Sequence, residues 1–197
     1  MKKLLVVPCL VMAVSAGGSM VSMAAGGWVQ ESGTWVYYNN SGDKAADVLK
    51  KSGNKWYYLD SEGKMVKDQL VEVNGDFYYM NSSGAAVTNE WRSVPNDSPS
   101  DGEPDEWWYY FQGNGKAVKK PSGASGVKLI SISSKAGTNR YIFDENGRMM
   151  SGWISENGEM ISEEDAWKSG VYYAGEPDDG KVVTGWKYLT AVNDEDT

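Results

Sequence analysis

The chain has 197 residues, enough for one domain of moderate size or for a row of small units. It contains 23 Gly, 12 Tyr and 9 Trp but only 3 Phe, and its formal net charge is -8. This composition argues against one large aliphatic core, and an acidic chain is a poor candidate for binding nucleic acid, which proteins grip through Lys and Arg.

Residues 1–25 have the pattern of an export signal. Lys2 and Lys3 precede an apolar run at 4–14, and small residues follow this run. The run is shorter than the roughly 20 residues that a helix needs to span a bilayer, so we expect contact with the membrane only during export. Cleavage would remove Cys9, the only cysteine, and the sequence contains no histidine.

An aromatic motif recurs along the rest of the chain. The stretches WVYYNNSG, WYYLDSEG and FYYMNSSG begin 21 residues apart, and each ends at a glycine. Their first residues are Trp35, Trp56 and Phe77. At wider spacing, further copies begin at Trp108 and Arg140, and a looser one begins at Val171. A fixed period of this size is typical of solenoids and repeat arrays.

We expect each copy to form a β-hairpin. In the second copy, alternate side chains would point to opposite faces of a strand, Trp56 and Tyr58 to one face and Tyr57 to the other. The turn is predicted at 60–63 and a return strand at 64–67. Because a lone hairpin is marginal in water, neighbouring hairpins would have to bury aromatic residues between them. The predicted fold is an all-β solenoid of stacked β-hairpins.

A second recurring position holds Trp or Leu between the copies, and we expect it on the connecting segments. It is occupied by Trp28, Leu49, Leu70, Trp91, Trp153 and Trp186.

Residues 96–106 are acidic and contain Pro and Gly, which indicates a solvated loop. Their spacing does not fit an EF-hand, so we expect no bound metal. The predicted organisation is a signal peptide at 1–25, regular repeats at 26–95, an acidic loop insertion at 96–106, and longer, irregular repeats at 107–197 with an incomplete last unit.

These motifs resemble the cell-wall-binding repeat family, also called choline-binding repeats, whose unit joins Gly-Trp to a Trp-Tyr-Tyr hairpin and an Asn/Asp-rich turn. The match is close in SGNKWYYLDSEGKMVKD (52–68) and EWWYYFQGNGKAVKK (106–120) and fair in NRYIFDENGRMMSGWI (139–154). The resemblance implies a superhelical stack of hairpins, in which aromatic residues of neighbouring repeats form cages for the choline headgroup of teichoic acid. Related repeats in glucosyltransferases and clostridial toxins bind sugars.

The sequence departs from the choline-binding pattern at three positions. Leu49 and Leu70 stand where that pattern has the Trp of Gly-Trp, and Arg140 stands in place of a hairpin Trp. Some cages would therefore be incomplete.

Aromatic rings that stay exposed are the candidate ligand-binding residues. A quaternary ammonium gains roughly 0.5–2 kcal/mol over each Trp or Tyr ring. Sugars can stack on the same rings. For each ring, the alternative is that it only packs in the core and binds no ligand. The candidates are Trp28, Trp35, Tyr37, Trp56, Tyr58, Trp91, Trp107, Trp108, Tyr110, Trp153, Tyr172, Tyr173 and Trp186.

The sequence indicates no catalytic role. It has no histidine, its one cysteine would be removed, and most carboxylates fall in predicted turns, so we expect neither an enzyme nor a bound cofactor. The predicted function is a secreted, cell-surface module that binds choline-bearing teichoic acid or a similar wall glycan in a Gram-positive bacterium. Two alternatives remain open: a repeat module that binds α-glucan or host carbohydrate, and a structural spacer or adhesin stalk.

Overall fold

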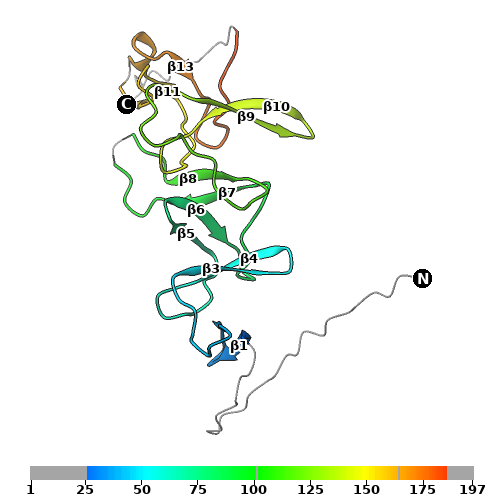
Figure 1. The fold of residues 1–197 in the computed structure, drawn as a ribbon. Coiled ribbons are helices and arrows are strands. Elements are labelled where there is room, and N and C mark those ends of the chain that lie inside the picture. Colours follow the sequence, from blue (N-terminus) through cyan, green and yellow to red (C-terminus); the bar gives the residue numbers. More distant parts are fainter. Residues whose placement is uncertain (1–25, 101, 164, 186–197) are drawn as a thin grey trace, which may run out of the picture. The chain divides into compact units, whose positions relative to one another are not determined.

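A computed structural model describes residues 26–100, 102–163 and 165–185, and confirms the predicted all-β fold (Figure 1). Contacts divide the chain into two compact units, 1–87 and 88–197. The predicted export signal and Trp186 lie outside the described residues. Within those residues no helix is long and apolar enough to cross a membrane.

The first unit consists of three antiparallel two-stranded hairpins. Their strands are β1 (Gly27–Glu31), β2 (Thr34–Tyr38), β3 (Val48–Ser52), β4 (Lys55–Leu59), β5 (Gln69–Val73) and β6 (Asp76–Met80). Two residues join the strands of each hairpin, and between β5 and β6 these are Asn74 and Gly75, with φ of +54° and +79°. Asn-Gly favours this tight turn because both residues tolerate a left-handed backbone.

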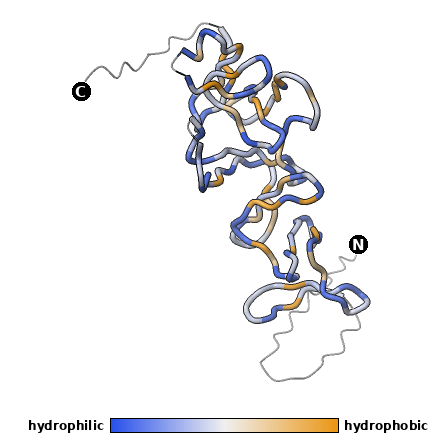
Figure 2. Tube along the Cα trace, turned by 90° about the vertical axis from the view of Figure 1, so that its left-hand side faces the viewer, coloured by the Kyte–Doolittle hydropathy of each residue, from blue (hydrophilic) through white to orange (hydrophobic). Residues whose placement is uncertain are grey.

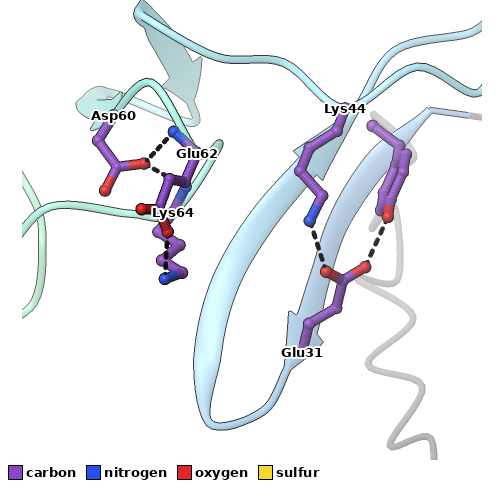
Figure 3. Close-up of polar contacts among 6 residues, drawn as sticks. Glu31, Lys44, Asp60, Glu62 and Lys64 are labelled. Atoms are coloured by element: carbon purple, nitrogen blue, oxygen red, sulfur yellow. Dashed lines mark hydrogen bonds and ion pairs between the residues drawn. The ribbon is translucent and has the colours of Figure 1, made fainter.

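The predicted strand pairing is wrong. β4 pairs with β3, which precedes it, and not with residues 64–67, which follow it. The turn at 60–63 is present, but only an isolated bridge between Leu59 and Met65 comes after it. Asp60 Oδ1 closes this turn by accepting hydrogen bonds from the backbone N–H groups of Glu62 and Lys64, at 2.9 and 2.8 Å (Figure 3). The Met65 N–H then donates to the Trp35 carbonyl of the preceding hairpin, so this segment is shared between two hairpins.

The expectation that the recurring Trp or Leu lies on connecting segments is also wrong. Leu49 and Leu70 lie inside β3 and β5, the first strands of their hairpins. Each faces a tyrosine across the hairpin, Tyr58 and Tyr79 respectively. These positions belong to the same two-stranded ladder as the aromatic motif, so they can contribute to one site with it.

The segment after each aromatic turn holds consecutive hairpins together. The Met65 N–H donates to the Trp35 carbonyl of the previous hairpin at 2.8 Å, and the Val66 N–H donates to Tyr58 of its own hairpin at 3.0 Å. The same pair of bonds recurs in the next repeat, where Ala86 donates to Trp56 at 2.8 Å and Val87 donates to Tyr79 at 3.0 Å. Backbone hydrogen bonds as well as side-chain packing therefore link the hairpins of this unit.

The core of the first unit is narrow and runs along its hairpins. Leu59 and Met80 are fully buried, and Val71, Tyr78 and Ala86 are buried beside Met80 or close to it. Along the trace, hydrophobic stretches alternate with hydrophilic turns (Figure 2). This pattern agrees with a core shared between small neighbouring units.

The second unit contains longer hairpins and a small three-stranded sheet. Its elements are β7 (Glu90–Pro95), β8 (Glu106–Phe111), β9 (Leu129–Ser134), β10 (Gly137–Ile142), β11 (Trp153–Ile154), β12 (Met160–Ile161), the 3-10 turn η1 (Ala166–Lys168) and β13 (Tyr172–Tyr173). β11 is the middle strand of the small sheet, between β12 and β13.

The acidic loop extends the β7–β8 hairpin of the second unit. The ladder continues to the pair Pro95 and Glu106. Beyond it, the Asn96 N–H donates to the Asp105 carbonyl at 2.7 Å, and Asn96 Nδ2 donates to the Pro104 carbonyl at 3.0 Å. The loop is therefore anchored where it leaves the strands.

Two hydrophobic clusters form the core of the second unit. One surrounds Phe143, which is 1% exposed, and contains Tyr141 and Met149. The other surrounds Ile154, which is fully buried. The link seen in the first unit recurs here, since the Met149 N–H donates to the Trp108 carbonyl at 2.8 Å.

Candidate functional site

Three aromatic rings from two consecutive hairpins meet in the first unit. Trp28 on β1 lies directly opposite Tyr37 on β2, and their ring centroids are 5.3 Å apart at an interplanar angle of 76°. Tyr57, from β4 of the next hairpin, approaches Trp28 at 5.3 Å and 67°. All three side chains are half-buried. We call Trp28, Tyr37 and Tyr57 the first ring cluster.

The second unit builds the same arrangement with other residues. Trp91 on β7 lies opposite Tyr110 on β8, with centroids 5.1 Å apart, and Tyr141 of the next hairpin approaches Trp91 at 4.9 Å. Trp91 and Tyr110 are half-buried, whereas Tyr141 is buried. Burial raises the pKa of Tyr141, which keeps its phenol neutral. We call Trp91, Tyr110 and Tyr141 the second ring cluster.

Other places in the fold hold only part of this arrangement, among them the β5–β6 hairpin, where Leu70 lies opposite Tyr79. In the β3–β4 hairpin, Leu49 replaces the tryptophan opposite Tyr58, and both pack against the core around Met80. In the small sheet, Trp153 lies opposite Tyr173 with ring centroids 5.1 Å apart. Burial and a hydrogen bond from its hydroxyl to Glu176 raise the pKa of Tyr173 to about 12.

The remaining sequence candidates lie outside the two ring clusters. Trp107 is 7% exposed, and the guanidinium of Arg148 covers its ring at 4.8 Å, so it is part of the core. Trp56 and Tyr58 pack against the core of the first unit, Trp108 and Tyr172 pack against the two cores of the second unit, and half-buried Trp35 lies opposite Gln30 in its hairpin.

Sequence reasoning missed Tyr57 and Tyr141, the rings that the following hairpin supplies. The alternation of side chains along WYYL does place Tyr57 on the face opposite Trp56 and Tyr58. That signal could have separated Tyr57 from its neighbours. It could not show that this face meets Trp28 of the preceding hairpin.

A polar network flanks the first hairpin, on the face opposite Trp28 and Tyr37. Glu31 accepts hydrogen bonds from Lys44 Nζ at 2.7 Å and from the Tyr38 hydroxyl at 2.6 Å (Figure 3). These two bonds lower the pKa of Glu31 below its ordinary value of 4.5, with Lys44 the larger cause. Lys44 lies six residues after Tyr38, so the network ties the aromatic turn back to β1.

Replacing Glu31 by glutamine should cost a small, pH-dependent amount of stability. Because its pKa is lower in the folded chain, the carboxylate stabilises the fold fully above pH 4.5, and this contribution disappears as the pH falls through the folded value. The pair is partly exposed, so the loss should stay below about 1 kcal/mol. Thermal unfolding of Glu31→Gln and wild type at pH 7 and pH 3 tests this. Glu62→Gln, in an exposed ion pair with Lys64, is the control, and equal losses at both pH values would contradict the expectation.

The chemistry available in the ring clusters is that of aromatic faces. Within the described ranges, no three acidic, cysteine or histidine side chains gather closely enough to hold a metal ion. Trp and Tyr rings at these distances attract a cation through their quadrupole, most strongly where water is excluded. Their half-exposed faces could also stack on the apolar face of a sugar.

Comparisons with known proteins identify the repeat. Residues 49–91 match the family model described as the choline-binding repeat. The structure of choline binding protein F from Streptococcus pneumoniae is 27% identical, with a TM-score of 0.50, and the match covers 84% of this chain and 47% of that one. Comparison with curated protein sequences finds no match.

Two further solved structures from Streptococcus pneumoniae resemble this chain. CbpJ is 25% identical with a TM-score of 0.48, over 80% of this chain and 42% of that one. The choline binding domain of Spr1274 is 33% identical with a TM-score of 0.36, over 50% of this chain and 99% of that one. The chain thus spans less than half the length of choline binding protein F and of CbpJ.

The fold and the ring clusters define a repeat protein built from linked aromatic hairpins. The sequence match then names the repeat: the chain belongs to the choline-binding repeat family.

Proposed function

We propose that this chain is a non-catalytic module that holds a protein at a Gram-positive cell surface by binding the choline of teichoic acid. The observation that carries the proposal is the repetition of one three-ring arrangement. In both units a Trp lies opposite a Tyr in one hairpin and meets a Tyr of the next, with centroid distances of 5.3 and 5.3 Å and of 5.1 and 4.9 Å.

Packing alone does not require this arrangement at every hairpin. In the β3–β4 hairpin Leu49 occupies the tryptophan position and packs against the core, so core packing there does not need an aromatic ring. In the two ring clusters the tryptophan is half-buried and contacts two tyrosines. Several aromatic rings gathered in one place attract a quaternary ammonium more strongly than a single ring does.

The same proposal includes the route to the surface. Residues 1–25 would direct export and then be removed, which leaves an acidic chain without lysines 2 and 3. An acidic chain attracts a cationic group, and this favours choline over an anionic polymer as the recognised element.

Titration of the mature chain with choline and with dextran tests the proposal through tryptophan emission. We expect saturable quenching at millimolar choline and none with dextran, together with retention on a tertiary-amine resin and release by choline. A response to dextran alone would favour a glycan-binding module. Silence with both ligands would favour a structural spacer, and either result would overturn the choline proposal.

A further inference from the structure

A lysine stands beside the first ring cluster, whereas the equivalent position of the second cluster holds an isoleucine. Lys50 Nζ lies 5.0 Å from the centroid of the Tyr37 ring, and Lys50 is directly opposite Tyr57 in the β3–β4 ladder. Side chains at directly opposed positions point to the same face of an antiparallel pair. The ammonium group of Lys50 is therefore on the ring-cluster side of the hairpin.

In the part of the chain that the structure describes, no acidic side chain forms an ion pair with this ammonium group. Among the described residues Lys50 has no ion-pair partner, whereas Lys44 is paired with Glu31. Lys50 and Tyr37 line a shallow depression of about 520 Å³, together with the turn residues 39–41. In this turn the Ser41 hydroxyl donates to Asp43 at 2.8 Å, so the nearby carboxylate is engaged within the turn.

The second ring cluster provides a natural comparison. The residue opposite Tyr141, at the position equivalent to Lys50 opposite Tyr57, is Ile130. Lys181, whose charge reaches Tyr141, is paired with Asp179. The second cluster therefore has no unpaired cation at the position where the first has Lys50.

We infer that Lys50 makes the first ring cluster selective for a quaternary ammonium that carries an adjoining phosphate, as phosphocholine does, over a bare quaternary ammonium. This inference rests on the proposed function. A bare cation among the three rings meets the like charge of Lys50, whereas the phosphate of a zwitterion can lie over the depression and pair with it. Two like charges within several ångströms at a protein surface alter affinity by about fivefold or more.

The full chain labelled with 5-fluorotryptophan separates the two clusters in one sample. The ¹⁹F resonances of Trp28 and Trp91, assigned with Trp→Phe variants, report the first and second cluster respectively. Titrations with choline and with phosphocholine should give an affinity ratio of about five in favour of phosphocholine at Trp28. The ratio at Trp91 should lie near one.

Lys50→Gln and Lys55→Gln form a matched pair of variants. Both remove one positive charge from the same hairpin, but Lys55 is exposed and lies opposite Ser52. Lys50→Gln should tighten choline binding and weaken phosphocholine binding at Trp28, which brings the ratio near one. Lys55→Gln should leave the ratio as in wild type.

The outcomes separate this inference from the proposed function. If both ligands shift Trp28 but Lys50→Gln leaves their ratio unchanged, or Lys55→Gln changes it equally, the role of Lys50 is overturned and choline binding stands. If neither ligand shifts Trp28 or Trp91, both proposals are overturned.

Discussion

Replacing Phe143 by alanine should lower the free energy of unfolding of the second unit by about 3–5 kcal/mol. Phe143 is 1% exposed, and its ring stacks on Trp91 at 6.0 Å with an interplanar angle of 20°. Removing the ring leaves a cavity between the second ring cluster and the core around Met149. Urea unfolding followed by tryptophan emission measures the loss.

Phe143→Leu is the matched control for this prediction. Leucine keeps most of the apolar volume, so its cost should be about 1 kcal/mol. If the alanine variant lost no more stability than the leucine variant, Phe143 would not support the core as its burial indicates. Choline binding at the second cluster should weaken in step with stability, because Phe143 also buttresses Trp91.

Replacing the tryptophan of either ring cluster by leucine should weaken choline binding at that cluster by about 2- to 30-fold, since one ring contributes roughly 0.5–2 kcal/mol. Leucine is chosen because the chain itself uses Leu49 at the equivalent position of the β3–β4 hairpin. Trp28→Leu and Trp91→Leu should therefore remain folded. Calorimetric titration with choline measures each variant.

Trp167→Leu is the control for the two cluster variants. Trp167 is 62% exposed and belongs to neither ring cluster, so its loss should leave choline binding unchanged. Equal weakening in all three variants would show that binding follows total tryptophan content and not the clusters. Replacing both Trp28 and Trp91 should remove most binding, and retention of wild-type affinity would contradict the proposed site.

The sequence predicted the repeat and the hairpins but not the partner of each aromatic strand. The glycines that end WYYLDSEG and FYYMNSSG do lie in turns, at Gly63 and Gly84, with φ of +75° and +81°. The hairpin turns themselves are the shorter pairs such as Asn74-Gly75, which sit before the aromatic motif. An Asn-Gly pair signals a tight hairpin more strongly than a longer polar turn, and giving it that weight would have corrected the pairing.

The candidate site was predictable only within a single hairpin. Trp28 and Tyr37 share one ladder, and their proximity follows from the local pattern. Tyr57 and Tyr141 come from the next hairpin, and their approach depends on the angle between hairpins, which alternation along a strand does not encode. Trp107 is the opposite case, a predicted site residue that lies outside the ring clusters. It lies in β8 beside Trp108, and Arg148 from a later turn covers its ring.

The hydrogen bond from the Met65 N–H to the Trp35 carbonyl recurs one repeat later, between the Ala86 N–H and the Trp56 carbonyl. In both cases the segment after the aromatic turn supplies the backbone donor for an acceptor in the preceding hairpin. Removing one 21-residue repeat would still leave a backbone N–H donor beside a matching carbonyl acceptor. Duplicating one repeat would add one more such hydrogen bond. Such a chain can therefore be lengthened or shortened by whole repeats, which changes the number of hairpins without altering those that remain.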